Sequence, residues 1–207
     1  MNTTNFFAIE GIDGSGKTSQ IARLKERFAQ EKIPAHFTRE PSDLTVGKLV
    51  RDMLEGRKTM DNRVIAALFA ADRLDHILDP EDGMLAQLAK GQTVITDRYY
   101  FSSYAYNGVD MPIEWVISAN SQAAALLRPT ATIFLDLSPD VALQRISQNR
   151  ESFELFETKE RLEQVRKNYL AAFKSLKQQE TVEIIDASAT EEEVAQALWQ
   201  TISKYYT

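Results

Sequence analysis

A glycine-rich segment near the N-terminus has the residues and spacing of a phosphate-binding loop. Residues 11–18 read Gly-Ile-Asp-Gly-Ser-Gly-Lys-Thr, which matches G-x-x-x-x-G-K-[ST] directly after a short apolar run. Glycines let backbone N–H groups curl around phosphate oxygens, and the N-terminus of the following helix adds positive potential. Lys17 would reach the outer phosphates, and the Thr18 hydroxyl would be a ligand of Mg²⁺. The segment therefore predicts a nucleotide site, the plainer alternative being a Gly-rich turn with a surface lysine.

Further short motifs place arginines along the first half of the chain. They are Thr38-Arg39-Glu40-Pro41, Gly47-Lys48-Leu49-Val50-Arg51, Leu68-Phe69-Ala70-Ala71-Asp72-Arg73 and Asp97-Arg98-Tyr99, the last followed by Ser102-Ser103-Tyr104-Ala105-Tyr106-Asn107. The N-K-x-D motif of guanine-specific GTPases does not occur in the sequence. Motor and sensor ATPases are usually larger or multidomain. The arginines therefore indicate a second anion that binds opposite the nucleotide.

The elements that must position these motifs are short apolar strands alternating with amphipathic helices. Strands are predicted at residues 6–9, 35–38, 93–96, 132–137 and 181–185. Helices are predicted after the glycine-rich loop, at 46–53, at 62–76, from Pro112 through Ala123, after Ser138-Pro139, at 158–176, and after a capping box of Thr190 and Glu193. This order favours a parallel sheet covered on both faces. Ligands of such sheets bind at the carboxyl ends of the strands, where the motifs fall.

Composition sets the class of protein. The 207 residues are 43% hydrophobic and 26% charged, as expected for a single globular domain spanning 1–207. A net charge of -6 gives no broad basic surface for nucleic acid or a membrane. The lack of cysteine excludes disulfides, thiolate metal sites and a cysteine nucleophile. No signal peptide or membrane-spanning run is recognisable, so we expect a cytoplasmic protein.

With these motifs in this order, the chain resembles the thymidylate kinase (dTMP kinase) family from Phe7 to about Ser188. The resemblance implies a three-layer α/β fold of the P-loop nucleoside-monophosphate kinase type. Its five-stranded parallel sheet has the order 2-3-1-4-5, with helices on both faces and a short lid at about 147–157. The resemblance also implies a homodimer that uses Mg²⁺ and transfers the γ-phosphoryl group of ATP to dTMP, giving dTDP and ADP in dTTP synthesis.

The family pattern also implies which residues bind ATP and the metal. The ATP site is assigned to Gly11, Ile12, Asp13, Gly14, Ser15, Gly16, Lys17, Thr18, Ser19 and Arg145. Asp97 matches a Walker-B-like carboxylate that positions Mg²⁺ through water, beside Thr18 as direct ligand. The turn at 186–188 resembles the segment that lies beside the adenine. The residues implied in catalysis are Lys17, Arg98, Arg150, Asp97 and Asp13.

The acceptor site follows from the same resemblance. It is assigned to Asp13, Glu40, Pro41, Arg51, Phe69, Arg73, Arg98, Ser102, Ser103, Tyr106 and Asn107. By this assignment Phe69 stacks on the thymine ring and Arg73 donates to the base O4. Arg51 and Arg98 grip the acceptor phosphate, and Tyr106 lies beneath the sugar, where it would crowd a 2′-OH.

The arginine that acts on the transferring phosphoryl group is a separate question. Some family members carry it inside the phosphate loop, at the position held here by Gly14, and others supply it from the lid. Since glycine has no side chain, we expect this chain either to use the second route or to do without such an arginine. Arg150 in the polar segment 147–152 is the first candidate and Arg145 the second. The alternative is that Arg150 pairs in solvent with a nearby glutamate.

Each residue has a plainer explanation when taken alone. Phe69 could be core, Arg73 a solvated partner of Asp72, and Tyr106 a cover for the sheet edge; the joint spacing favours one cleft. His36 and His76 match no functional position and are expected to be structural or surface residues. The chain differs from many bacterial relatives at two places, with Ser42-Asp43 in place of Gly-Gly and Asn107 in place of Gln. These differences affect the expected preference for a base more than the expected type of reaction.

Three other functions remain open at this point. One is a kinase for another monophosphate such as dUMP, and another is a regulatory or assembly ATPase that uses the loop as a switch. The third is a purely structural domain. Turnover of ATP with and without a monophosphate separates them.

Overall fold

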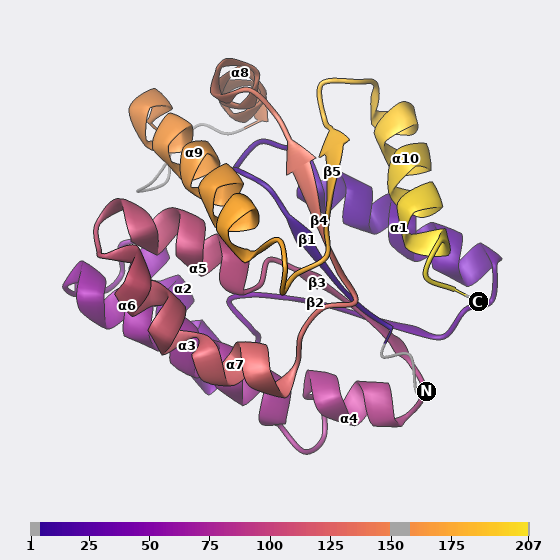
Figure 1. The fold of residues 1–207 in the computed structure, drawn as a ribbon, viewed down its shortest axis with the longest axis horizontal. Helices are drawn as coiled ribbons and strands as arrows, with labels where there is room; N and C mark the ends of the chain where they lie inside the picture. The colour runs from indigo at the N-terminus through magenta and orange to yellow at the C-terminus, as the bar shows by residue number, and fades with distance from the viewer. Residues whose placement is uncertain (1–4, 150–157, 207) are drawn as a thin grey trace.

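The computed structural model describes residues 5–149 and 158–206, and its centre is a parallel β-sheet between two layers of helices (Figure 1). Within these ranges the strands are β1 (Phe6–Glu10), β2 (Ala35–Arg39), β3 (Thr93–Asp97), β4 (Ala131–Asp136) and β5 (Val182–Asp186). They pair in parallel in the order β2-β3-β1-β4-β5. The predicted fold class and strand order are therefore confirmed.

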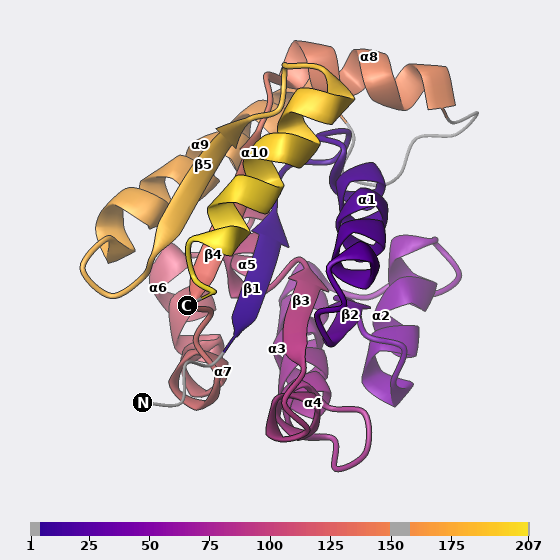
Figure 2. The same cartoon turned by 90° about the vertical axis from the view of Figure 1, so that its right-hand side faces the viewer.

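Helices cover both faces of the sheet. They are α1 (Lys17–Gln30), α2 (Thr45–Leu54), α3 (Asn62–Leu78), α4 (Met84–Ala89), α5 (Tyr100–Tyr106), α6 (Ile113–Ala119), α7 (Ser121–Leu126), α8 (Pro139–Asn149), α9 (Lys159–Leu176) and α10 (Glu191–Ser203), with a 3₁₀ turn at Asn107–Val109. In Figure 1, α1 and α10 lie on one side of the sheet and α3, α5 and α9 on the other. In Figure 2 the strand arrows of β1 and β5 point to the end of the molecule where α8 lies.

Strand burial follows from position in the sheet. All five residues of the central strand β1 are buried, which is why its sequence is almost wholly apolar. The edge strands β2 and β5 are partly exposed and carry more polar residues. The core therefore lies around β1, β3 and β4, and the loops after these strands are held on a rigid base.

The helix caps and one helix boundary test the sequence predictions. The capping box of Thr190 and Glu193 starts α10 as predicted, and the Thr158 hydroxyl accepts from Arg161 N at the start of α9. The continuous helix expected from Pro112 through Ala123 is wrong, because the chain divides at Asn120 into α6 and α7. Of the expected lid, residues 147–149 end α8, and 150–157, with Arg150, lie outside the described residues.

Candidate active site

The glycine-rich loop joins β1 to α1 in a conformation that requires its glycines. Gly14 and Gly16 have φ angles of 78° and 91°, in the left-handed region that side chains disfavour. A Cβ on Gly14 would also lie 2.6 Å from the backbone oxygen of Ala142 in α8. No side chain fits there without displacing α8, so an arginine at this position is incompatible with the place that α8 takes in this structure.

Lys17 is the buried cation of this loop. Its Nζ donates to the carbonyl oxygens of Gly11 and Ile12, both at 3.0 Å. Burial, together with the positive charge of Arg98, lowers the pKa of Lys17 to about 8, against the opposing effect of Asp97, Asp13 and Glu10. An anionic ligand bound near Lys17 would therefore stabilise the protonated, positively charged form of its side chain.

ATP binding should consequently weaken as the pH rises through 8. Deprotonation removes the charge of Lys17, while bound phosphate favours the protonated form and raises its pKa, so binding takes up a proton above pH 8. We expect the dissociation constant for Mg-ATP, measured by calorimetry, to rise up to about tenfold per pH unit in this range. The Lys17→Met variant should bind weakly and show little of this pH dependence. An equal pH dependence in both proteins would contradict the role of Lys17.

A cleft of about 770 Å³ opens over this loop. Its lining includes residues 13–19 of the loop and Asp97, Arg98 and Arg145. Arg145 donates from Nη2 to the Ala187 carbonyl at 3.1 Å, and Ala187, just after β5, lines the cleft too. Of the predicted ATP residues, all but Gly11 and Ile12 therefore line one cleft, with Arg145 near the predicted adenine segment. Gly11 and Ile12 are buried.

The residues implied in magnesium binding have the right chemistry for a hydrated cation. Asp97 ends β3 and lines the same cleft as Thr18. Its Oδ1 atom is buried and has no hydrogen-bond partner among the described residues. Those residues hold no group of three or more acidic or histidine ligands. A single carboxylate with one hydroxyl fits a metal that keeps most of its waters and binds ligand phosphates.

A second, smaller pocket of about 110 Å³ lies beside the ATP cleft. It is lined by Asp13, Glu40, Pro41, Leu54, Phe69, Arg73, Arg98, Ser102, Ser103, Tyr106 and Asn107. Every predicted acceptor residue except Arg51 belongs to this set. Asp13, Pro41, Leu54 and Arg98 line both cavities, so a ligand in each would meet at these four residues.

Arg98 stands at this junction in an unusual backbone conformation. Its φ angle is 69°, and its Nη1 donates to Gly11 O and Ser102 Oγ, both at 3.2 Å. Its Nη2 is paired with Asp13 Oδ1, and its guanidinium lies 4.9 Å from the ring centre of Tyr106. The left-handed backbone turns the side chain back over the phosphate loop.

A buried carboxylate supports Arg98 from below. Glu10, the last residue of β1, is fully buried and accepts from Tyr99 N at 2.8 Å and from Ser102 Oγ at 2.6 Å. The Tyr169 hydroxyl of α9 also donates to it, at 2.8 Å. Burial raises the pKa of Glu10 against the lowering effect of these donors and of Arg98. Glu10 thus ties the start of α5, and through Ser102 the guanidinium of Arg98, to the central strand.

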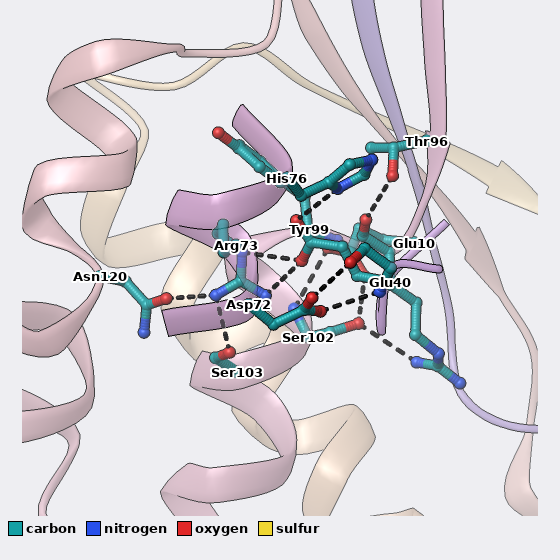
Figure 3. Close-up of polar contacts among 12 residues, drawn as sticks. Glu10, Glu40, Asp72, Arg73, His76, Thr96, Tyr99, Ser102, Ser103 and Asn120 are labelled. Atoms are coloured by element: carbon teal, nitrogen blue, oxygen red, sulfur yellow. Dashed lines mark hydrogen bonds and ion pairs between the residues drawn. The ribbon is translucent and has the colours of Figure 1, made fainter. Parts of the chain in front are cut away.

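Arg73 lies at the closed end of the smaller pocket in a buried polar network (Figure 3). Its Nε and Nη2 bind Glu40 Oε2 at 2.8 and 2.6 Å, and its Nη1 donates to Ser103 Oγ at 3.0 Å and to Asn120 Oδ1. His76 is also buried in this network, 3.4 Å from Glu40, so its structural role is clear. The alternative of a solvated Arg73 is wrong.

Ser42 and Asp43, which depart from the common pattern, have separate roles. Ser42 is buried, and its N and Oγ donate to Asp72 at 2.9 and 2.5 Å, which fixes the loop after Pro41 onto α3. Asp43 is exposed and pairs with Arg39 at 3.0 Å and with Arg51 at 3.1 Å. Arg51 also donates to the Pro41 and Ser42 carbonyls, so a phosphate would compete with Asp43 for this arginine.

Removing that competitor should tighten binding of the acceptor. In Asp43→Asn we expect the KM for the monophosphate to fall about two- to fivefold, because an exposed ion pair contributes roughly 0.2–1 kcal/mol. The KM for ATP and kcat should stay within twofold. The inhibition constant of the corresponding nucleoside should be unchanged, because a nucleoside has no phosphate for Arg51 to bind. An increased KM would show that Asp43 helps to place Arg51 instead.

Comparison with known proteins agrees with this geometry. The family model described as thymidylate kinase matches residues 9–198. The chain belongs to the thymidylate kinase family. A probable thymidylate kinase of Pyrobaculum calidifontis is 40% identical over 194 residues, which are 92% of this chain and 91% of that protein. The thymidylate kinase of Symbiobacterium thermophilum is 35% identical over 91% of this chain and 88% of its own length, and a probable thymidylate kinase of Methanosphaera stadtmanae is 35% identical over 97% and 98%.

Several residues of this kinase site were not predicted from the sequence. Leu54 lines both cavities, and Arg39 lines the ATP cleft. Glu10 supports Arg98 through Ser102, and Asn120 accepts from the buried Arg73. Arg39 stands beside Pro41 in a motif that was recognised, so its place at the strand end was the available signal. Among the described residues, no helix is long and apolar enough to cross a membrane.

Proposed function

We propose that the protein is a dTMP kinase that transfers the γ-phosphoryl group of ATP to dTMP, giving dTDP and ADP for dTTP synthesis. Membership of the thymidylate kinase family carries this proposal. The two cavities that meet at Asp13 and Arg98 support it, because a transfer between two nucleotides needs a donor site and an acceptor site in contact.

The reaction does not require a strong general base from the protein. A phosphate oxygen of dTMP, already anionic, attacks the γ-phosphorus of ATP while the bond to the β–γ bridging oxygen breaks and ADP leaves. The protein must hold two polyanions in line and neutralise the charge on the transferring group. Lys17 and the loop N–H groups serve the donor side, and Arg51 and Arg98 serve the acceptor phosphate.

Thr18 and Asp97 are the residues that would hold Mg²⁺, Thr18 by its hydroxyl and Asp97 through water. When bound, the ion neutralises charge on the β- and γ-phosphates. The buried Oδ1 of Asp97, which has no hydrogen-bond partner in the described part of the chain, supports this assignment.

The smaller pocket accounts for a thymidine acceptor. Phe69 supplies an aromatic face for the base, and Arg73 an N–H donor for O4. Tyr106 is held by Asp13, because its hydroxyl accepts from Asp13 N at 3.1 Å and donates to Asp13 Oδ2 at 2.9 Å. A ring fixed in this way leaves little room for a 2′-OH, which favours deoxyribose.

The proposal includes a homodimer in the cytoplasm. Helix α3 leaves a stripe of apolar side chains exposed at helical spacing, namely Val64, Ala67, Ala71 and Leu78. Such a stripe suits a self-complementary contact between two copies. We expect Ala67→Arg to shift the sedimentation coefficient from that of a dimer to that of a monomer. Wild-type protein sedimenting as a monomer at micromolar concentration would contradict the homodimer.

A coupled ADP-release assay across a panel of monophosphates tests the function. ADP release should require Mg²⁺ and a pyrimidine deoxynucleoside monophosphate, with dTMP preferred over dUMP and dCMP. ATP hydrolysis that does not depend on any monophosphate would instead identify a regulatory ATPase. If the protein preferred dUMP, the proposed type of reaction would stand, but the preferred acceptor would be dUMP in place of dTMP.

A further inference from the structure

Asn120 occupies the break between α6 and α7 and is almost fully buried, at 2% exposure. Its backbone ends one helix and begins the next, since its N–H donates to Ile117 O and its carbonyl accepts from Ala124 N. The side chain is therefore set by a fixed backbone on both sides. Figure 3 shows it directed at the guanidinium of Arg73.

The orientation of its amide group is determined by two different partners. Nδ2 donates to the Val116 carbonyl at 2.8 Å, which the end of α6 leaves without a helical partner. The Oδ1 atom must then face the other way, where it accepts from Arg73 Nη1. Because an arginine can only donate and a carbonyl can only accept, the opposite amide orientation would place donor against donor and acceptor against acceptor.

Among the described residues, the contacts of Arg73 leave one of its N–H donors without an acceptor. A guanidinium has five N–H groups, and those of Arg73 bind Glu40 from Nε and Nη2 and bind Ser103 and Asn120 from Nη1. One Nη2 hydrogen remains for a ligand in the pocket that Arg73 lines. The Tyr99 ring also packs against the face of the guanidinium, with 5.4 Å between the ring centre and Arg73 Cζ. This contact further restricts movement of the guanidinium.

We propose that Asn120 is a positioning residue that makes Arg73 selective for a carbonyl at the 4-position of the pyrimidine. This inference rests on the proposed function. Glu40 binds one edge of the guanidinium, and Asn120 and Ser103 bind its Nη1 group. The guanidinium cannot then rotate, so the remaining Nη2 hydrogen points in a fixed direction. Without Asn120, an unpaired Nη1 hydrogen would be available to water and the guanidinium could swing about its Glu40 edge. Discrimination between a carbonyl acceptor and an amino donor on the base would then fall.

The test compares substrates that differ only at the 4-position. Steady-state constants are measured for dTMP, for the analogue of dTMP that lacks O4, and for dCMP. In Asn120→Leu, which keeps the branching and the number of heavy atoms of the side chain and removes both polar atoms, the ratio of kcat/KM for dTMP to that for the O4-less analogue should fall about tenfold. The KM for dTMP should rise, while kcat for dTMP and the KM for ATP should stay within threefold.

Two further variants separate positioning from folding. Asn120→Asp keeps an oxygen acceptor for Arg73 Nη1 and should retain at least a third of the wild-type ratio. Gln122→Leu makes the same amide-to-alkyl change at an exposed position of α7 and should leave every constant unchanged. If Asn120→Leu does not fold, the same ratios are measured on Asn120→Ala.

The outcomes are distinguishable. If the leucine or alanine variant loses activity on all three substrates equally, Asn120 is only structural and the inference is overturned. If Asn120→Asp loses discrimination as fully as Asn120→Leu, an acceptor for Arg73 is not what matters. If wild-type protein does not phosphorylate dTMP, the proposed function fails before the role of Asn120 is in question.

Discussion

Replacing Arg98 with alanine should lower kcat/KM for dTMP about 10²–10³-fold, with the KM for ATP within a fewfold of wild type. The side chain lines both cavities and lies where the acceptor phosphate would meet the donor. Loss of a preorganised donor to a developing charge typically costs this much in rate. The variant also removes the ion pair between Arg98 and Asp13, so Arg98 no longer offsets the negative charge of this carboxylate beside the incoming phosphate. Steady-state kinetics with each substrate varied in turn measures the effect.

The backbone of Arg98 offers an internal control. A φ angle of 69° is strained for alanine as for arginine, whereas glycine adopts it freely. We therefore expect Arg98→Gly to be more stable than Arg98→Ala by about 1 kcal/mol in chemical denaturation while being equally inactive. Arg98→Lys keeps the charge but not the forked geometry and should recover only part of the activity. An alanine variant with more than a tenth of wild-type kcat/KM would exclude a direct role in transfer.

The fold was readable from the sequence because its signals are local. The central strands are short apolar runs, and the caps at Thr158 and Thr190 are set by residues three positions away. The glycine-rich loop carries its own signature, and the structure explains Gly14 by a close approach of α8 that no local pattern reveals. Local patterns thus place the elements, and the parallel order brings their carboxyl ends together.

The supporting residues were not predicted because their partners are distant in sequence. Asn120 lies 47 positions from Arg73 and was hidden in an apparently continuous helix. Glu10 lies 92 positions from Ser102 and looks like one polar residue at the end of an apolar strand. Both are buried polar groups whose role follows from hydrogen bonds across elements. Family resemblance supplied residues that line the cavities, and the structure supplied those that hold them.

If an arginine acts on the transferring phosphoryl group, it must come from outside the phosphate loop. Gly14 cannot carry a side chain beneath Ala142. Arg145 is in the ATP cleft, but its Nη2 is directed to the Ala187 carbonyl, near the predicted adenine segment. Arg145→Ala should therefore act mainly on ATP binding, raising the KM for ATP with a smaller effect on kcat. We propose Arg150, five residues further along the polar end of the same segment, as the arginine of the transition state.

Arg150→Ala should accordingly lower kcat about 10²–10⁴-fold with both KM values little changed, since arginines on a transferring phosphoryl group are worth roughly 10³–10⁵ in GTPases. An interaction made only in the transition state lowers kcat and kcat/KM together, whereas lost ground-state binding appears in KM. Arg145→Ala is the matched control, because it also removes a guanidinium group, from a position five residues earlier in the sequence. If Arg150→Ala keeps more than half of the wild-type kcat, Arg150 does no more than pair with neighbouring glutamates in solvent. A large kcat loss in Arg145→Ala with an unchanged KM for ATP would transfer the role to Arg145.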